Sequence, residues 1–594
     1  MCGIAGFFGM RERESARQML SAMQAAMAHR GPDGQGIWID AASRAGLAHV
    51  RLAVMDPTPA GAQPMTSHDG RYMVSFNGEI YNFREVRREL EDMGVGFQSG
   101  TDTEVLIEAF SRWGVDALPR LRGMFAFGIW DAQLGRGWLA RDGFGIKPLY
   151  YAHIGDGLVF GSELRVMEAA GVPRMLDPSR VAGFFATGSV PEPGTLFQAV
   201  EVLPPGHVLA WDRDGSRTAP FWEVQFPVPL AMRSADAVVR ARGALEDSVR
   251  AHFVSDVPVG LFLSGGIDST ALLALACRLG LAEQLTTFSV AVDDVGADES
   301  AVAARSARRF GARHHVLALD AKSAKESFPA FLEAMDVPSV DGFNTWTVSR
   351  FARQHGYKVV LSGLGGDELF AGYPSFRDVP RLLAAARMLE RVPGSGALVR
   401  AVATRAPARW RRAADAVVRD VTPDIAHRAY RGIFPWPDAV RLAAHFCGVP
   451  ADEVQDPLAT QAPTKDGANA VSGLELTRYM RNQLLRDSDV MSMAHGLELR
   501  LPLVDQRLFD TIAAVPAAQR LKPGKGLLRA AVPELPAEVL NAPKRGFSFP
   551  VRKWLEEDFG GAFVEAGRGL PVSATEWYQK WSLVTFSHWR ASRA

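Results

Sequence analysis

The first chemically notable residue is a thiol directly after the initiator methionine, Cys2 in the segment "MCGIAGFFG". The thiolate is the nucleophilic form of cysteine. Removal of the methionine would leave a free α-amino group, whose reference pKa of about 7.7–8.0 allows it to accept the thiol proton. Gly3 would let the backbone bend close to the reacting group. A cysteine at position two is more often inert, so the prediction of an N-terminal nucleophile depends on the residues around it.

Polar residues that could bind an amino acid follow within the next hundred positions. Arg51 could hold a carboxylate, and Glu79 and Asp102 could hold an ammonium group. The Asn77 amide and the Gly78 backbone N–H, in "FNGEIYNF", could stabilise an oxyanion. Any one of these residues could instead form a surface ion pair or a turn. Together they predict a site that binds an amino acid by both charged ends and presents its side chain to the thiol.

A second chemical motif is the stretch "LFLSGGIDST", where an apolar run ends at Leu263 and a glycine turn leads into an apolar helix. Glycines allow backbone N–H groups to face an anion, hydroxyls add donors, and the helix N-terminus attracts negative charge. These features predict a phosphate-binding loop. No lysine follows the glycines, so the loop is not of the GxxxxGK[ST] type. Taken alone, the same residues could simply cap a helix.

These motifs lie in two regions of the chain that differ in their pattern of apolar residues. Up to about residue 222, short alternating strands and hairpin signals near 156–157 and 214–215 predict a sheet sandwich with a few helices. Residues 223–233 look like a linker. Beyond them the apolar runs "VPVGLFL", "LTTFSVAV" and "YKVVLSG" alternate with helical stretches, which predicts a doubly wound parallel sheet. From about residue 376 the chain is expected to be mostly helical, and the predicted domains are 1–222 and 234–594.

Composition excludes several classes of partner. The 66 basic residues balance the 66 acidic ones, so the arginine-rich segment "RAPARWRRAADAVVRD" is interpreted as a solvated helix face and not as a nucleic-acid surface. No apolar run reaches the ~20 residues of a membrane span, and the first residues lack a secretory signal, so we expect a cytoplasmic protein. Three cysteines form neither a disulfide framework nor a metal-binding spacing. The sequence allows a homodimer without specifying an oligomeric state.

Several segments of the first 165 residues resemble the glutamine-hydrolysing asparagine synthetases: "MCGIAG", "HRGPDG", "NGEIYNFRE", "ARDGFGIKPLYY" and "FGSEL". In that family the first domain is a class II glutamine amidotransferase, an α+β sandwich of the N-terminal-nucleophile hydrolase type. The resemblance implies that Cys2 is the nucleophile and that Asn77 and Gly78 form the oxyanion hole. It also implies hydrolysis of glutamine to glutamate and ammonia through a thioester. The implied glutamine-binding residues are Arg51, Asn77, Glu79 and Asp102.

The second half resembles the ATP-pyrophosphatase domain of the same family, an α/β doubly wound parallel sheet with a helical C-terminal part. "SGGIDS" is similar to its pyrophosphate loop and "LGGDELFAGY" to its second nucleotide loop. The resemblance implies ATP as substrate, Mg²⁺ held by Asp268 and Asp367, and Lys525 as a catalytic residue that stabilises charge on the acyl-adenylate transition state. The implied ATP-binding residues are Phe262, Ser264, Gly265, Gly266, Asp268, Ser269, Val290, Ser362 and Gly363.

The resemblance therefore implies one enzyme with two reactions. A carboxylate is activated with ATP as an acyl-adenylate, pyrophosphate leaves, and ammonia from the Cys2 site displaces AMP to form an amide. Aspartate is the expected acceptor and asparagine formation the expected function. A noncatalytic scaffold is disfavoured because Cys2, Asn77, Asp268 and Asp367 are all present.

One departure concerns the acceptor. Where aspartate-using members read SGEGSDE this chain reads "SGLGGDE", so Leu364 replaces an acid. An aliphatic side chain can neither accept a proton nor bind a charged amine. Either a neighbouring acid such as Glu368 or Asp341 performs that role, or the acceptor is another carboxylate, in specialised or surface-polymer metabolism.

Overall fold

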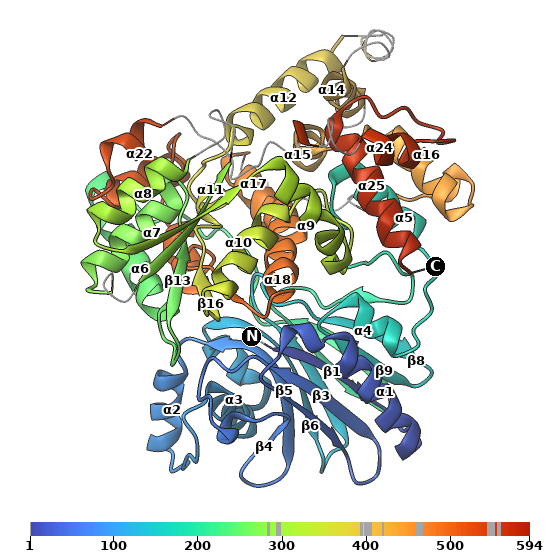
Figure 1. The fold of residues 1–594 in the computed structure, drawn as a ribbon, viewed down its shortest axis with the longest axis vertical. Coiled ribbons are helices and arrows are strands. Elements are labelled where there is room, and N and C mark those ends of the chain that lie inside the picture. Colours follow the sequence, from blue (N-terminus) through green and yellow to red (C-terminus); the bar gives the residue numbers. More distant parts are fainter. Residues whose placement is uncertain are drawn as a thin grey trace.

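The computed structural model describes residues 2–281, 285–292, 299–392, 396, 399, 407–418, 421–457, 467–542, 553–554 and 560–593. Two sheet-containing parts lie against each other, the N-terminal one at the bottom of Figure 1 and the C-terminal one above it. The architecture predicted from the sequence is confirmed: an α+β sandwich of two antiparallel sheets is followed by a parallel α/β domain with additional helices.

Two six-stranded antiparallel sheets form the N-terminal part. In spatial order the first sheet contains β10 (Glu201–Val202), β8 (Tyr150–Ile154), β9 (Gly157–Gly161), β1 (Gly3–Phe8), β3 (Ala45–Arg51) and β2 (Gly34–Ile39). The second contains β12 (Gly215–Pro220), β11 (His207–Asp212), β7 (Arg136–Arg141), β6 (Gly123–Asp131), β5 (Tyr72–Ile80) and β4 (Met65–Thr66). The β8–β9 and β11–β12 pairs are the two hairpins that the turn signals predict.

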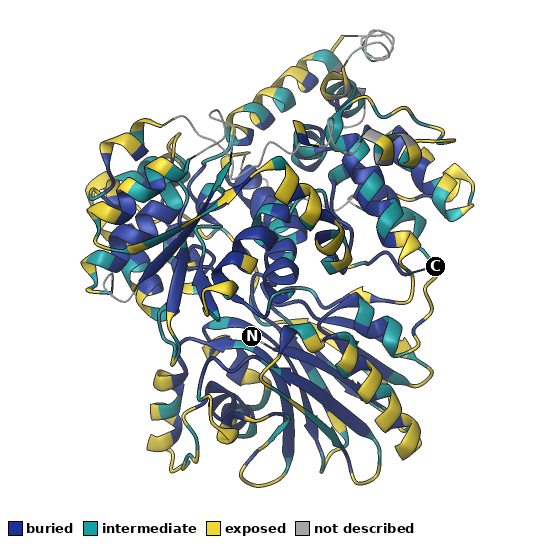
Figure 2. Cartoon of the chain, in the orientation of Figure 1, coloured by how far each residue is buried: buried dark blue, intermediate teal, exposed yellow. Residues whose placement is uncertain are grey.

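Helices cover the outer faces of both sheets. α1 (Arg13–Ala26) and α4 (Leu164–Ala169) pack on the first sheet, and α2 (Phe83–Asp92) and α3 (Asp102–Trp113) lie over the second. Period-two alternation in β6 explains the layers: Phe125, Phe127 and Ile129 join the core beneath these two helices. Ala126 and Trp130, on the opposite face of β6, join the core between the sheets. The central strands are therefore buried on both faces, whereas the outer helix faces remain exposed (Figure 2).

The C-terminal part is built on a five-stranded parallel sheet. Its spatial order is β15 (Arg313–Leu319), β14 (Thr286–Val292), β13 (Val259–Phe262), β16 (Val359–Leu361) and β17 (Glu498–Arg500). The sequence predicted the three central strands, which are continuous apolar runs. It did not reveal β15, whose residues alternate between exposed and half-buried over most of its length, or β17, which carries two charged residues in only three positions.

Helices surround this sheet on both faces and continue beyond it. They are α6 (Ser234–His252), α7 (Ile267–Arg278), α8 (Ser300–Arg309), α9 (Ala321–Ala334), α10 (Phe343–Gln354), α11 (Gly366–Leu369), α12 (Ser375–Glu390), α14 (Ala408–Val418), α15 (Pro423–Arg431), α16 (Trp436–Cys447), α17 (Gly467–Leu474), the π-helix η6 (Glu475–Leu485), α18 (Arg486–Met493), α19 (Gln506–Ala513), α20 (Ala517–Arg520), α21 (Gly526–Ala531), α22 (Ala537–Asn541), α24 (Gly560–Ala566) and α25 (Trp577–Ala591). In α6, Ala241, Leu245 and Val249 recur at helical spacing and are buried.

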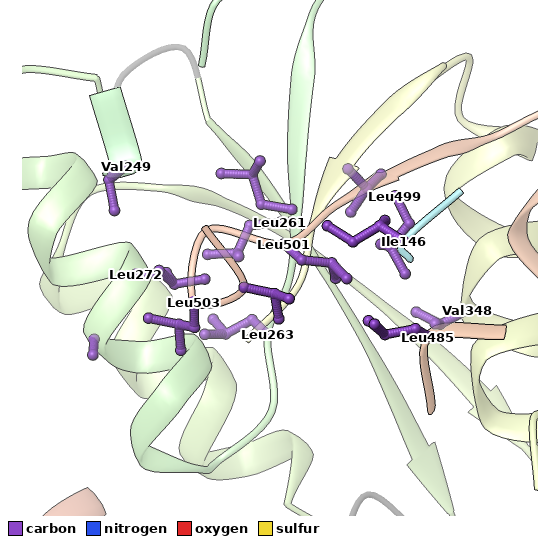
Figure 3. Close-up of a cluster of buried hydrophobic side chains, with 14 of the residues drawn as sticks. Ile146, Val249, Leu261, Leu263, Leu272, Val348, Leu485, Leu499, Leu501 and Leu503 are labelled. Carbon is purple, nitrogen blue, oxygen red and sulfur yellow. The ribbon is translucent and has the colours of Figure 1, made fainter. Parts of the chain in front are cut away.

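Apolar cores join the two parts of the chain. Ile146, from the N-terminal part, lies beside Leu499 and Leu501 of the parallel-sheet domain (Figure 3). A second shared core lies under α5 (Pro178–Thr187), which packs against α16 and α25. Because these side chains leave water together, the two parts form one continuous structure. Among the described residues, no helix combines the length and hydropathy of a membrane span.

Candidate active sites

The thiol lies at the junction between the two parts of the chain. Cys2 immediately precedes the buried strand β1 and is 8% exposed. Its backbone carbonyl accepts a hydrogen bond from Nε of Arg30 at 3.1 Å. The same guanidinium contacts Asp489 of α18 at 2.8 Å, with both side chains fully buried. Burial raises the pKa of the Cys2 thiol, while a backbone N–H from Leu52 and the charge of Arg51 oppose that increase.

The predicted oxyanion donors lie beside Cys2 on β5, in the opposing sheet. Asn77 is fully buried, and its Oδ1 accepts a hydrogen bond from the backbone N–H of Cys2 at 3.1 Å. Its Nδ2 has no hydrogen-bond partner within the described part of the chain. A Cβ at Gly78 would lie 2.2 Å from the carbonyl oxygen of Met124, so only glycine fits there. An unused buried donor is costly, and a developing oxyanion would satisfy it.

Arg51 ends β3 and lines the same pocket. Its guanidinium donates to the backbone carbonyls of Thr58 at 2.8 Å and Asp56 at 2.5 Å. These bonds fix its orientation against the loop that follows β3. The close approach requires Gly61, since a Cβ there would lie 2.0 Å from a guanidinium nitrogen. Arg51 is therefore held at the pocket wall before any substrate carboxylate arrives.

Two buried acids, Glu79 and Asp102, also line the pocket. Asp102, at the first position of α3, accepts a hydrogen bond from the backbone N–H of Ile80 at 2.9 Å. Burial raises the pKa of Asp102 to about 6. Burial and the neighbouring Asp102 also raise the pKa of Glu79. An ammonium ion between them would favour both ionised forms, so the pair suits the amino end of an amino acid.

Two residues of the parallel-sheet domain complete this pocket, and the sequence analysis assigned no role to either. Arg500 of β17 donates to Glu79 Oε2 at 3.1 Å and to Glu498 Oε1 at 2.5 Å. Glu498 itself lines the pocket. The remaining oxygen of Glu79, Oε1, is buried without a hydrogen-bond partner among the described residues. The sequence signal was present in "GLELRLPLVD", where two charges interrupt an apolar run at period two.

The pocket around Cys2 is small and is lined by residues of both domains. Its volume is about 30 Å³. That space suffices for a water molecule but not for an amino acid. Its lining residues include Cys2, Arg51, Gly78, Glu79, Asp102 and Glu498. Binding of a molecule the size of glutamine must therefore displace part of the wall, which includes Val54, Met55 and Gly61 of the loop after β3.

The second site lies at the carboxyl ends of the parallel strands. β13 and β16 are neighbours in parallel register, with Leu261 opposite Leu361, so the loops that follow them lie side by side. In the first loop, Ser264 and Ser269 are joined through their hydroxyls at 3.0 Å, and the N–H of Gly266 donates to Ser264 Oγ at 3.1 Å. A Cβ at Gly363 would approach the backbone N of Ser269 to 2.8 Å. Glycine thus permits the two loops to touch.

Asp268 and Asp367, one from each loop, converge on Lys525. The Lys525 ammonium forms a hydrogen bond with Asp268 and lies 2.7 Å from Asp367 Oδ1. Burial lowers the lysine pKa, but the two carboxylates raise it to about 12, so the side chain is charged. The convergence of two carboxylates on one positive charge shows that they can hold a cation together. Oxygen donors of this kind suit Mg²⁺ completed by phosphate oxygens.

A cavity of about 810 Å³ extends from these loops. Of the predicted ATP-binding residues, the cavity is lined by Phe262, Ser264, Gly265, Gly266, Asp268, Ser269, Ser362 and Gly363. Val290 is not among the lining residues; Phe288, two positions earlier on β14, is. Lys525, Leu364 and Asp341 also line the cavity. Glu368 is buried behind them, where it accepts a hydrogen bond from the Tyr373 hydroxyl at 2.9 Å.

Comparison with known proteins matches both parts of the chain to described families. Residues 1–222 match the model "Glutamine amidotransferase domain", and residues 240–577 match the model "Asparagine synthase". The linker and domain boundaries predicted from sequence remain our assignment.

Relatives match over nearly the whole chain. "Asparagine synthetase [glutamine-hydrolyzing] 1" of Bacillus subtilis is 33% identical, covering 94% of this chain and 88% of the relative. A "Putative asparagine synthetase [glutamine-hydrolyzing]" of Mycobacterium bovis is also 33% identical, covering 93% of this chain and 88% of the relative. "Amidase chry2" of Gibberella zeae is 27% identical, over 93% of this chain and 90% of the relative.

Proposed function

This chain belongs to the asparagine synthase family, and on that premise we propose that it is an ATP-dependent ligase that uses glutamine nitrogen to amidate a carboxylate. The observation that supports this proposal most is a contact between the Cys2 site and the synthase part: Arg30 bonds both the Cys2 carbonyl and Asp489 of α18. A glutaminase pocket that contacts the synthase part so directly favours nitrogen transfer over simple glutamine hydrolysis.

In the first reaction, Cys2 is the N-terminal nucleophile after removal of methionine. Its sulfur attacks the glutamine carboxamide, and the thiol proton passes through the α-amino group to the leaving ammonia. Nδ2 of Asn77 and the N–H of Gly78 donate to the oxygen that becomes negative. Arg51 binds the carboxylate of glutamine, and Glu79 with Asp102 binds its ammonium group. Water then hydrolyses the thioester to glutamate.

In the second reaction, a carboxylate oxygen of the acceptor attacks the α-phosphorus of ATP and pyrophosphate leaves. The Ser264–Ser269 loop and the Ser362–Gly363 turn bind the nucleotide. Asp268 and Asp367 would hold Mg²⁺, which would neutralise charge on the triphosphate. Lys525, which is buried and charged, would stabilise negative charge on the reacting phosphate. Ammonia then attacks the acyl carbon and AMP leaves.

Ammonia has to reach the acyl-adenylate without being protonated and lost to water. Apolar side chains of both parts share one core at the junction, among them Ile146, Leu485 and Leu499 (Figure 3). Such surroundings disfavour the ammonium ion and favour neutral ammonia. We infer that nitrogen crosses the molecule through this junction.

Aspartate is the acceptor we propose first, which would make the product asparagine. Leu364 supports a second candidate, amidation of a different carboxylate, because this side chain places no acid on its side of the cavity. Product analysis tests both candidates. With ATP, glutamine and aspartate we expect AMP, pyrophosphate, glutamate and asparagine in equal amounts. ADP in place of AMP would contradict adenylation, and AMP formation only with another carboxylate would select the second candidate.

A further inference from the structure

The helices α12 and α14 lie at the end of the molecule opposite the N-terminal part (Figure 1). They pack against each other, and α14 also packs on α15. One side of the pair is therefore covered by protein and the other faces outward. Neither of the two reactions proposed above uses the outward side, so its composition has no explanation in the catalytic sites.

The outward side of α12 carries only arginines and apolar residues. Val379 and Ala386 are buried on the inner side. Among residues 377–392 whose side chains the structure describes, the exposed ones are Arg377, Pro380, Arg381, Ala384, Ala385, Arg387, Met388, Arg391 and Val392 (Figure 2). Met388 is 70% exposed and Val392 56%. A helix side that faces water normally carries polar residues, so this side is unusual.

The start of α14 extends the same composition. Arg409 and Trp410 are exposed, Trp410 by 58%, and the Arg409 guanidinium lies 5.6 Å from the centre of the Trp410 ring. Further along the helix Arg412 turns inward and donates to the carbonyl of Ala429 at 3.2 Å. The arginine-rich segment interpreted from sequence as a solvated helix face is thus divided, and its outward part pairs an arginine with a tryptophan.

The exposed charges of this surface are not neutralised locally. Arg377 pairs with the half-buried Asp378 at 2.7 Å. Arg381, Arg387 and Arg391 form no ion pair with any residue that the structure describes. The chain as a whole is neutral, with 66 basic and 66 acidic residues, so this end of the molecule concentrates positive charge that is balanced elsewhere.

The helix α2, on the N-terminal part, shows what an ordinary solvent-facing helix of this protein looks like. Its exposed residues include Arg84 and Arg88 but also Glu85 and Glu89, so charges of both signs alternate. It exposes no tryptophan among arginines. Arginines interleaved with large apolar side chains fit instead a partner that is negatively charged at its surface and apolar beneath.

We propose that the outward sides of α12 and α14 form a docking surface for an anionic phospholipid membrane. The arginines bind the headgroups, and Met388, Val392 and Trp410 insert between them. Tryptophan favours this interfacial depth because its ring is apolar and its N–H is polar. A nucleic acid would use the guanidinium groups but would leave the aliphatic side chains exposed to water. This inference goes beyond the proposed ligase function and does not depend on it.

The test measures co-sedimentation of the full chain with vesicles. One set contains phosphatidylcholine alone, and the other contains in addition about 30% phosphatidylglycerol, which supplies the negative charge. We expect the partition coefficient of the protein to be at least about 10-fold higher for the anionic vesicles. Raising the salt concentration from about 0.1 M to about 0.5 M should reduce that binding at least about fivefold, because salt screens the arginines from the headgroups.

Two variants on different helices locate the binding surface. Arg387→Gln with Arg391→Gln removes two exposed charges from α12 and should lower the partition coefficient for anionic vesicles at least about 10-fold. Trp410→Ala on α14 should lower it at least about fivefold while leaving the salt dependence in place, because it removes an apolar contact and no charge. The matched control is Arg84→Gln with Arg88→Gln, the same charge change at the same spacing on α2, which should alter binding less than about twofold.

Equal binding to both kinds of vesicle would overturn the proposal, and so would equal losses in the α12 and α2 double variants. If anionic vesicles do not bind but a DNA duplex does, or if the chain self-associates and Trp410→Ala prevents it, the surface serves that partner and not a membrane. Thermal unfolding and ammonium-dependent AMP release check that each variant is folded, and either the α12 or the α14 variant alone suffices. Absence of AMP release from the parent protein would contradict the ligase function and leave membrane binding untouched.

Discussion

The two sites of this protein differ most in the volume that is free for a ligand. The pocket at Cys2 encloses about 30 Å³ between two domains, whereas the nucleotide cavity encloses about 810 Å³. In the small pocket, buried groups of both domains already bond to one another, as Arg500 does to Glu79. In the large cavity, Asp341, Asp487 and Gln483 face open space. The comparison indicates that glutamine must open a preassembled site, while the acceptor enters one that already has room.

The largest expected effect separates the two sites at the nucleophile. Cys2→Ala should lower glutamine-dependent amide formation by at least about 1,000-fold, because no other side chain can form the thioester. Synthesis with ammonium chloride should stay within about twofold of the parent rate, measured as AMP release. Cys447→Ala is the control. Equal loss with both nitrogen sources would show that the sites are not separable.

The converse change acts on the nucleotide cavity. Asp268→Asn removes a carboxylate that contacts Lys525 and is proposed to hold Mg²⁺. We expect pyrophosphate release to fall by about 100-fold, since the charge that positions the triphosphate is lost. Glutamate formation from glutamine should continue at a measurable rate. The control is Asp236→Asn, on an exposed part of α6, which should leave both rates unchanged. An unchanged rate of pyrophosphate release in Asp268→Asn would refute the metal assignment.

A smaller effect tests the contact between β17 and the pocket at Cys2. Arg500→Lys keeps one positive charge but cannot reproduce bonds to Glu79, Glu498 and the carbonyls of His252 and Val254 together. We expect the KM for glutamine to rise about 10-fold, with ammonium-dependent synthesis little changed. A thermal unfolding curve controls for loss of structure. An unchanged KM for glutamine would show that Arg500 only joins the domains.

The smallest expected effect is a pH dependence of glutaminase kcat/KM, caused by an acid in the pocket at Cys2. Asp102 has a pKa of about 6, so it is ionised above that pH and loses its charge as the pH falls through it. If the charge binds the glutamine ammonium, glutaminase kcat/KM should be about fourfold lower at pH 5.5 than at pH 8. Asp102→Asn should have a lower kcat/KM that no longer declines over this range. A parallel decline in the variant would assign it to another group.

Sequence reasoning identified candidate groups where they lie in contiguous segments. The fold class followed from strand periodicity and from the change near residue 222, where short alternating strands give way to apolar runs separated by helical stretches. The Asn77–Gly78 pair and the Ser264–Ser269 loop could be recognised because each is a short segment whose local conformation presents its own groups. β17 was not predicted, because a strand of three residues is too short for its period-two pattern to stand out, and the roles of its two charged residues depend on a domain far away in the sequence.

What the sequence by itself determined is the set of reactive groups and the local elements that carry them: a thiol before a buried strand, and a glycine loop between a strand and a helix. Only the tertiary structure decided which distant groups meet, such as Lys525 with Asp268 and Asp367, and Arg500 with Glu79. Those pairings depend on packing of apolar surfaces that bring segments hundreds of positions apart into contact. Charge and hydrogen-bond interactions act only over such short distances, so the electrostatics of each site, and hence its chemistry, follow from the packing.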